Sequence, residues 1–225
     1  MSESRIRGEV GHPYVESVTS TPLRSGSSRA ERFEERRTQL AQSALETLGE
    51  LGYARASLRE IAQNSEFTHG VVHYYFADKV ELITHCVQLY KEQAVNRFDE
   101  IVLSSRSAPE LIERFAAKFV QTMTTEAPLH RLWYDLRTQS MFEDSFRDDV
   151  LEIDRTFQAM TWRVMARYAA LAGGTALLDE RATYALFDGL FEHALLRHLA
   201  GDPGAAADLS ARVHWLLPRV VALDV

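Results

Sequence analysis

Apolar side chains recur every three or four residues through most of this 225-residue chain. That spacing predicts a succession of amphipathic helices, because it places the apolar positions on one face of each helix. The first stripe ends at Gly52, as is typical of a helix C-terminus, and consists of Leu40, Ala44, Leu45, Leu48 and Leu51. No segment shows the strict alternation of a half-buried strand. The expected fold class is therefore all-α.

The helices that follow form a regular series. A long helix is expected from Asp78 to about Ser104, and Pro109 and Pro128 each stand near a helix start, where proline is tolerated in the first turn. The pair Gly173-Gly174 interrupts the pattern. The remaining helices are expected at residues 129–142, 148–172, 178–199 and 204–221.

Two short helices joined by a tight break are predicted between Ser57 and Phe76. Helices this short are marginal in water, so they need a shared core. The apolar positions spaced to form that core are Leu58, Ile61, Ala62, Val72 and Phe76. Ser57, with Glu60 three residues later, is typical of a capping box, and Thr68 is expected to cap the second helix.

A helix pair with so short a turn, whose second helix is crowded with polar and aromatic side chains, has the layout of a DNA-reading helix-turn-helix. The side chains expected to contact base edges are Thr68, His69, Val71 and Tyr74. Among these, Val71 suits a thymine methyl group. The side chains expected to contact phosphates are Arg59, His73, Tyr75 and Lys79.

From Arg37 to Leu82, about a fifth of its length, the chain resembles the tetracycline-repressor (TetR) family of transcriptional regulators. The residues that carry the resemblance are Ala44, Leu45, Gly52, Tyr53, Ser57, Leu58, Ile61, Ala62, Gly70, Tyr75, Phe76, Lys79 and Leu82. The resemblance implies an N-terminal three-helix helix-turn-helix DNA-binding domain followed by a helical ligand-binding and dimerisation domain.

Three positions depart from the family pattern. Glu66 stands where a turn glycine is usual, His73 replaces an aromatic residue that contacts phosphate, and Val71 replaces a frequent small hydroxyl residue. Glycine is favoured where φ is positive, so Glu66 predicts an altered turn. Its carboxylate is also unfavourable near phosphate.

The charge of the chain argues against tight non-specific DNA binding, because most such affinity comes from phosphate neutralisation. The formal net charge is −7. The placement of the cations compensates in part: arginines cluster at the start of the first helix, and further cations flank the reading helix. These cations are Arg29, Arg32, Arg36, Arg37, Arg55, Arg59 and Lys79. We therefore expect modest, strongly salt-dependent affinity sharpened by base readout and dimerisation.

The middle helices contain more aromatic and Met residues than a minimal bundle needs, and such walls suit an apolar or aromatic small molecule. Each of these residues alone is more often ordinary core, but the resemblance implies a sensor body. The candidate ligand-binding residues are Trp133, Arg137, Phe157, Trp162, Phe187 and His193. The ligand is expected to change the spacing of two DNA-binding heads and to weaken DNA binding.

The last two predicted helices carry wide apolar stripes. Two copies of this hairpin would form a four-helix bundle with two-fold symmetry, and the resemblance implies the same arrangement. The candidate dimerisation residues are Phe187, Leu190, Phe191, Leu195, Val213, Leu217 and Val220. The alternative is that these residues form the core of a single chain. A two-fold homodimer would read a near-palindromic operator in double-stranded DNA.

Composition and motifs exclude other classes of protein. The single cysteine, Cys86, rules out a disulfide framework and a Cys-rich zinc site and fits a reducing cytoplasm. The HExxH, CxxC and GxSxG motifs are absent, so no enzyme, metal or cofactor is expected. His69 and His73 have ligand spacing, but their place on the reading helix suits bases and phosphates better. No apolar run reaches about 18 residues, so no membrane span is expected.

The sequence thus predicts a disordered tail at residues 1–28, a helix-turn-helix domain at 29–83 and a helical ligand-binding and dimerisation domain at 84–225. The function it favours is a cytoplasmic, homodimeric repressor that a small apolar or aromatic molecule releases from DNA. The alternative is a helical ligand-binding or partner-binding protein whose degenerate helix-turn-helix no longer binds DNA, which the acidic head would favour.

Overall fold

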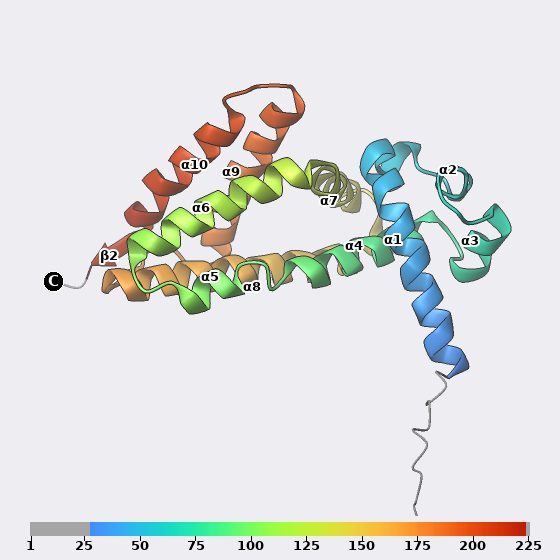
Figure 1. Ribbon diagram of the computed structural model, residues 1–225, viewed down its shortest axis with the longest axis horizontal. Coiled ribbons are helices and arrows are strands. Elements are labelled where there is room, and N and C mark those ends of the chain that lie inside the picture. The colour runs from blue at the N-terminus through green and yellow to red at the C-terminus, as the bar shows by residue number, and fades with distance from the viewer. Residues whose placement is uncertain (1–27, 224–225) are drawn as a thin grey trace, which may run out of the picture.

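The computed structural model describes residues 28–223, so the expected tail lies, apart from Ser28, outside the described residues. The fold is all-α, as predicted, apart from one pair of short strands. Three helices lie together at one end of an elongated molecule (Figure 1) and are called the head. They are α1 (Arg29–Arg55), α2 (Leu58–Gln63) and α3 (His69–Tyr75).

The remaining elements are called the body. Helices α4 and α8 run lengthwise away from the head, α6 and α9 pack against α8, and α10 packs against α6 and α9 (Figure 1). The α-helices of the body are α4 (Lys79–Ala94), α5 (Asp99–Ser104), α6 (Ala108–Thr125), α7 (Ala127–Ser140), α8 (Arg147–Ala172), α9 (Glu180–Leu199) and α10 (Ala205–Leu216). The shorter elements are the 3₁₀ turns η1 (Asp144–Phe146) and η2 (Leu217–Val220) and the strands β1 (Gly174–Ala176) and β2 (Val221–Leu223).

The core of the head forms where α1 packs against α2, α3 and α4. Val72 and Phe76 are fully buried in it, as the sequence predicted. Cys86 of α4 is also fully buried, and its Sγ donates a hydrogen bond to the Ala41 carbonyl 3.2 Å away. Burial raises the pKa of this thiol far above its ordinary value. The same core extends into the body through residues of α7 and α8, including Leu132 and Val150.

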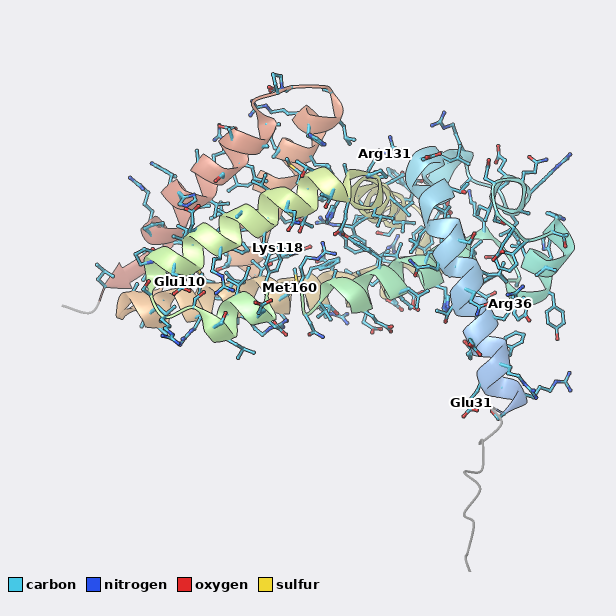
Figure 2. The ribbon with its side chains drawn as sticks, viewed as in Figure 1. Glu31, Arg36, Glu110, Lys118, Arg131 and Met160 are labelled. Atoms are coloured by element: carbon cyan, nitrogen blue, oxygen red, sulfur yellow. The ribbon has the colours of Figure 1, made fainter. Side chains whose placement is uncertain are left out.

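The end of α1 is joined tightly to α7. Gly52 has a φ of 74°, which only glycine adopts without strain. The sequence predicted that the helix stops there; α1 kinks at Gly52 and ends three residues later, at Arg55. Asp135 of α7 accepts a 2.6 Å hydrogen bond from the Tyr53 amide just after the kink. Arg131, seen where α7 meets α1 in Figure 2, donates to the carbonyls of Gly49 and Glu50. Helix α7 thus satisfies backbone groups that the kink leaves without helical partners.

Two features of the body differ from the prediction. The long helix expected to reach Ser104 ends at Ala94, and a turn separates it from α5. In that turn the Val95 carbonyl accepts a hydrogen bond from Arg163 of α8 at 2.8 Å, which gives the broken chain a partner outside the helix. The expectation of no strand was also wrong, because β1 and β2 pair antiparallel, with Gly174 opposite Leu223.

The predicted dimer stripe is largely the core of one chain. Phe187, Phe191 and Leu195 of α9 are 2–5% exposed, and Val213 and Leu217 of α10 are fully buried. Val220 is also buried, whereas Leu190 is half-buried. Six of the seven side chains predicted to form the surface between copies are therefore already buried within one chain, and only Leu190 stays partly exposed. Within residues 28–223, no helix is long and apolar enough to cross a membrane.

Candidate functional site

The turn between α2 and α3 is built from hydroxyl side chains. Ser57 caps α2 by accepting from the Glu60 amide, but its hydroxyl donates to the Glu60 carboxylate at 2.8 Å, so the capping box is only half formed. Thr68 caps α3 by accepting from the Val71 amide at 3.4 Å. Ser65 closes the turn, since its hydroxyl accepts from the Phe67 amide at 3.2 Å. Polar capping therefore fixes the turn that carries Glu66 in place of glycine.

Helix α3 is held against the head by one face. Val72 and Phe76 are fully buried, and Val71 is partly buried against the same core. The Tyr75 ring lies 4.8 Å from the ring of Phe33 in α1. Val71 and Tyr75 thus present only part of their surfaces to a binding partner, whereas the exposed side chains of α3 are free to contact one.

The opposite face of α3 is exposed. Thr68, His69 and His73 are exposed, and Tyr74 is 66% exposed. The rings of His69 and His73 meet edge to face at 4.4 Å. No cluster of metal ligands occurs among the described residues. Arg59 of α2 is exposed beside this face and lines a shallow groove with Thr68 and His69. Arg59, Thr68 and His69 thus share one groove, and His73 and Tyr74 are exposed on the same short helix.

The cations of the head divide into two groups. Arg32 and Arg36 are exposed on the N-terminal half of α1, where Figure 2 labels Arg36. Arg37 is used within the fold, because its guanidinium pairs with Glu81 at 2.7 Å and lies 4.9 Å from the centre of the Phe76 ring. The Nζ of Lys79 donates to the Tyr53 carbonyl at 3.1 Å. That bond holds the start of α4 to the end of α1.

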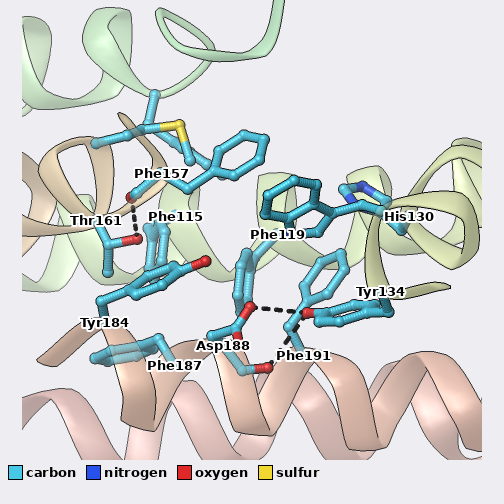
Figure 3. A pocket seen from close by; sticks show the side chains of 13 residues that line it. Phe115, Phe119, His130, Tyr134, Phe157, Thr161, Tyr184, Phe187, Asp188 and Phe191 are labelled. Atoms are coloured by element: carbon cyan, nitrogen blue, oxygen red, sulfur yellow. Dashed lines mark hydrogen bonds between the residues drawn. The ribbon is translucent and has the colours of Figure 1, made fainter. Parts of the chain in front are cut away.

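The body contains a pocket between α6, α7, α8, α9 and the turn before α5. Figure 3 shows its walls, which are mainly aromatic and carry a single carboxylate. The lining residues are Phe98, Phe115, Phe119, His130, Trp133, Tyr134, Phe157, Met160, Thr161, Tyr184, Phe187, Asp188 and Phe191. Apolar, aromatic walls with a few polar groups have the character of a small-molecule site.

The carboxylate in the wall is neutralised by its neighbours. Asp188 accepts from the Tyr134 hydroxyl at 2.9 Å, drawn in Figure 3, and pairs with Arg137 at 2.6 Å. Arg137 also lies 3.6 Å from Asp154, which accepts from the Tyr184 hydroxyl at 2.8 Å. Burial alone would lower the pKa of Arg137, but Asp188 beside it raises that pKa above its ordinary value. The guanidinium is therefore charged, and the network fixes Tyr134 and Tyr184 as rigid walls.

A second network ties the pocket to α4. The His130 Nε2 lies 3.1 Å from the Tyr90 hydroxyl, which donates to Glu126 at 2.9 Å. Glu126 also pairs with Arg97 at 2.7 Å. Burial, with a smaller contribution from the Arg97 charge, lowers the pKa of His130 to about 3. The imidazole in the pocket wall is therefore neutral near pH 7.

The structure brings only some of the predicted ligand-binding residues to this pocket. Trp133, Phe157 and Phe187 line it, and Arg137 supports it through Asp188. Trp162 does not line it, and His193 is exposed in a separate groove on the outside of α9. Helical spacing shows which residues share a face but not which neighbour that face meets, so the prediction failed at these two positions.

Comparison with known proteins matches this head to one family. Residues 40–86 match the model of bacterial regulatory proteins of the tetR family. Residues 40–86 thus form a domain of the tetR type. The family consists of helix-turn-helix transcriptional regulators, which are not enzymes. Its members bind DNA and small-molecule effectors and are typically dimers.

Three known proteins extend the similarity beyond the head. The transcriptional regulator PksA of Bacillus subtilis is 25% identical over 72% of this chain and 80% of its own length. The regulator BetI of Burkholderia mallei is 29% identical over 75% of this chain and 84% of its own length. A transcriptional regulator from Saccharomonospora viridis, solved in complex with choline, has a TM-score of 0.68 at 16% identity. It covers 84% of this chain and 98% of its own. This last likeness shows the shared fold.

Sequence reasoning missed several residues of the pocket. Tyr184, Asp188 and Phe191 come from α9 and His130 from α7, where they face Phe98 of the α4–α5 turn. The available signal was Asp188 itself, a carboxylate within the apolar stripe of α9, because such a group needs a buried cation as partner. Arg137, already a candidate, is that cation.

Proposed function

We propose that the chain is a cytoplasmic, homodimeric transcriptional repressor that a small molecule in the aromatic pocket releases from a near-palindromic operator. The observation that carries this proposal is the exposed face of α3. It is anchored from behind by Val72 and Phe76 and attached through α4 and α7 to a body with an aromatic pocket. The aromatic walls support an apolar or aromatic ligand.

The test of this proposal is selection of bound fragments from sheared genomic DNA of the source organism by the purified protein at two salt concentrations. We expect enrichment of a near-palindromic site whose half-sites lie about one DNA turn apart, with weaker recovery at the higher salt. No enrichment at low salt, from a sample shown to be a folded dimer, would instead support a ligand-binding protein with a silent helix-turn-helix.

Lys79 and His69 provide a matched pair of substitutions in the head. Lys79→Ala should weaken binding to all DNA sequences about equally and reduce the slope of log K against log salt by about one. His69→Ala should relax sequence preference, because a lost base contact costs about 1–3 kcal/mol only at the base that it reads. Fluorescence anisotropy with the selected site and a scrambled site measures the affinity and the sequence preference of both variants. Equal loss of specificity in the two variants would contradict this division of roles.

The second copy is proposed to pack on the outer faces of α9 and α10. Ala185, Gly189 and Leu196 are exposed along α9, and Ala211 and Trp215 are exposed along α10. Trp215 is 59% and Leu196 is 66% exposed, which is unusual for large apolar side chains on two adjacent helices. A two-fold contact here would still be formed by α9 and α10, as predicted from the sequence. It would use their outward faces and not the apolar stripe that is buried within one chain.

Helix α7 provides a direct route from the pocket to the head. One face of it lines the pocket with His130, Trp133 and Tyr134. Its other side holds the end of α1 through Arg131 and Asp135. A ligand that moves α7 therefore moves backbone groups of α1. The His130–Tyr90 contact provides a second route through α4, which begins four residues after α3 ends.

Gly49 offers a test of this coupling that needs no ligand. A Cβ at Gly49 would lie 2.9 Å from the Cβ of Pro128 and 3.3 Å from its carbonyl carbon, so Gly49→Ala should push α7 away from α1. We expect operator affinity to fall about fivefold without ligand, since changes along such routes are worth about 0.5–2 kcal/mol. The double variant with Pro128→Gly should recover affinity. Unchanged affinity in Gly49→Ala, measured by anisotropy, would exclude the α1–α7 contact as the route.

A further inference from the structure

The N-terminal part of α1, residues 29–39, is an overhang that the core of the head does not cover. The first buried side chain of the helix is Leu40, and within the overhang only Phe33 and Arg37 are half-buried. Figure 1 shows this part of α1 extending well past α2 and α3. A helix of this length is marginal in water by itself, and its other side chains are free to contact a partner.

The charged side chains of the overhang are sorted by face. Successive residues of a helix are about 100° apart, so three exposed arginines lie within an arc of about 60°. They are called the arginine stripe and are Arg29, Arg32 and Arg36. Glu31 and Glu34 lie on the opposite side of the helix, and Glu35 lies between the two sides. One face of the overhang is therefore basic.

The charges of the arginine stripe are not neutralised within the chain. Among residues 28–223, neither Arg29 nor Arg32 forms an ion pair. Arg36 donates to the uncharged side chain of Gln39 at 2.7 Å. Free guanidinium groups are well suited to phosphate oxygens, because each presents several N–H donors in a fixed geometry. The stripe therefore fits a partner that carries a row of phosphates.

Aromatic contacts hold the stripe beside α3. The ring of Phe33, which follows Arg32, lies 4.8 Å from the ring of Tyr75 and 6.0 Å from that of Tyr74. The Arg36 guanidinium lies 4.6 Å from the centre of the Phe67 ring, just before α3 begins. A duplex that meets the exposed face of α3 therefore brings its own backbone close to the stripe.

The length and direction of the stripe fit the backbone next to a half-site. From Arg29 to Arg36 the helix rises about 10 Å. Phosphates of one strand are about 3.4 Å apart along the DNA axis, so the stripe spans about three of them. Figure 1 shows the overhang pointing away from α9 and α10, on which the second copy is proposed to pack. In that dimer the stripe lies on the outer side of each half-site and not between the two.

We propose that the arginine stripe binds backbone phosphates just outside each half-site, on DNA that α3 does not read. This rests on the proposed function, in which α3 contacts the operator. The contact adds affinity without sequence preference, because phosphates carry no direct information about the bases. It supplies electrostatic attraction where the chain as a whole, with a net charge of −7, lacks it. The length of the DNA, and not only its sequence, then determines affinity.

The test compares two duplexes that carry the site selected from genomic DNA. One is trimmed at the outer edges of the half-sites, and the other is extended by one DNA turn, about 10 bp, on each side. Anisotropy over a range of salt concentrations gives the slope of log K against log salt for the wild type and for Arg29→Gln combined with Arg32→Gln. Arg36 is kept because it packs within the head. The matched control, Arg106→Gln combined with Arg155→Gln, has the same net charge but loses exposed arginines of the body.

On the extended duplex, the Arg29 and Arg32 double variant should reduce the slope by about one for each lost contact, which is about two per copy. The control should leave the slope unchanged. On the trimmed duplex, the double variant and the wild type should have the same slope. Hydroxyl-radical footprinting should show that the wild type protects the flanking backbone and that the double variant does not. Equal slopes for wild type and double variant on the extended duplex, or an equal change on both duplexes, would overturn the proposal.

An extended duplex of scrambled sequence separates this inference from the regulator proposal. If no genomic site is enriched but the double variant reduces the slope on the scrambled duplex, the phosphate contact stands and the sequence-specific regulator does not. If a site is enriched but the slopes are equal, the regulator stands and the phosphate contact does not. No binding to any duplex at low salt would overturn both.

Discussion

Replacing Phe76 by alanine is expected to abolish specific DNA binding. Phe76 is fully buried at the C-terminal cap of α3, with the Arg37 guanidinium 4.9 Å from its ring centre and the His85 ring at 5.7 Å. Truncating such a side chain costs about 3–5 kcal/mol through lost burial and the cavity that remains. That is a large share of the roughly 5–15 kcal/mol by which proteins are stable. The face of α3 that reads DNA would lose its support.

The matched control for Phe76→Ala is Phe142→Ala, because Phe142 is 80% exposed. This second substitution should change the free energy of unfolding by no more than about 0.5 kcal/mol. Urea denaturation followed by circular dichroism measures both variants, and anisotropy with the selected site measures DNA binding. Wild-type DNA affinity in Phe76→Ala would show that α3 does not depend on this anchor.

Replacing Arg137 by methionine is expected to destabilise the body by about 3 kcal/mol. The change leaves Asp188, whose side chain is 14% exposed, without its cation, and an uncompensated buried charge is strongly unfavourable. Urea denaturation of the variant and of the wild type at pH 7 measures this loss. An unchanged free energy of unfolding would contradict the role given to the ion pair.

Two further variants separate the contribution of this ion pair to stability from other effects of the substitution. Arg137→Met combined with Asp188→Asn should recover much of the lost stability, since the amide can still accept from Tyr134 and only Asp154, whose side chain is 27% exposed, loses a cation. Arg212→Met breaks the 2.8 Å pair with Asp208, but the Arg212 side chain is 53% exposed, so the loss should stay within about 0.5 kcal/mol. Additive losses in the double variant would contradict the pairing argument.

The head could be predicted in detail because its signals are local. The caps at Ser57 and Thr68 act within three residues, and the buried pair Val72 and Phe76 lies on one short helix. The stop at Gly52 depends on a single positive φ. Each of these features is set by neighbours in the chain, which a sequence displays directly.

The structure of the body was less predictable because it depends on contacts between elements that are distant in the sequence. The apolar stripe of α9 is the same whether it meets α8 or a second copy, so Phe187 and Leu195 were assigned to the wrong partner. The break after Ala94 is accompanied by a hydrogen bond from Arg163, 68 positions from its acceptor. The strands are only three residues long, too short for alternation to show.

Cys86 gives this protein a built-in reporter of motion in the head. It is the single cysteine of the chain, it is fully buried between α1 and α4, and its raised pKa keeps it as an unreactive thiol. Alkylation of the native protein therefore requires α4 to separate from α1, and the labelling rate measures how often that happens. The junction through which sensor and head communicate can thus be followed over time without introducing any probe residue.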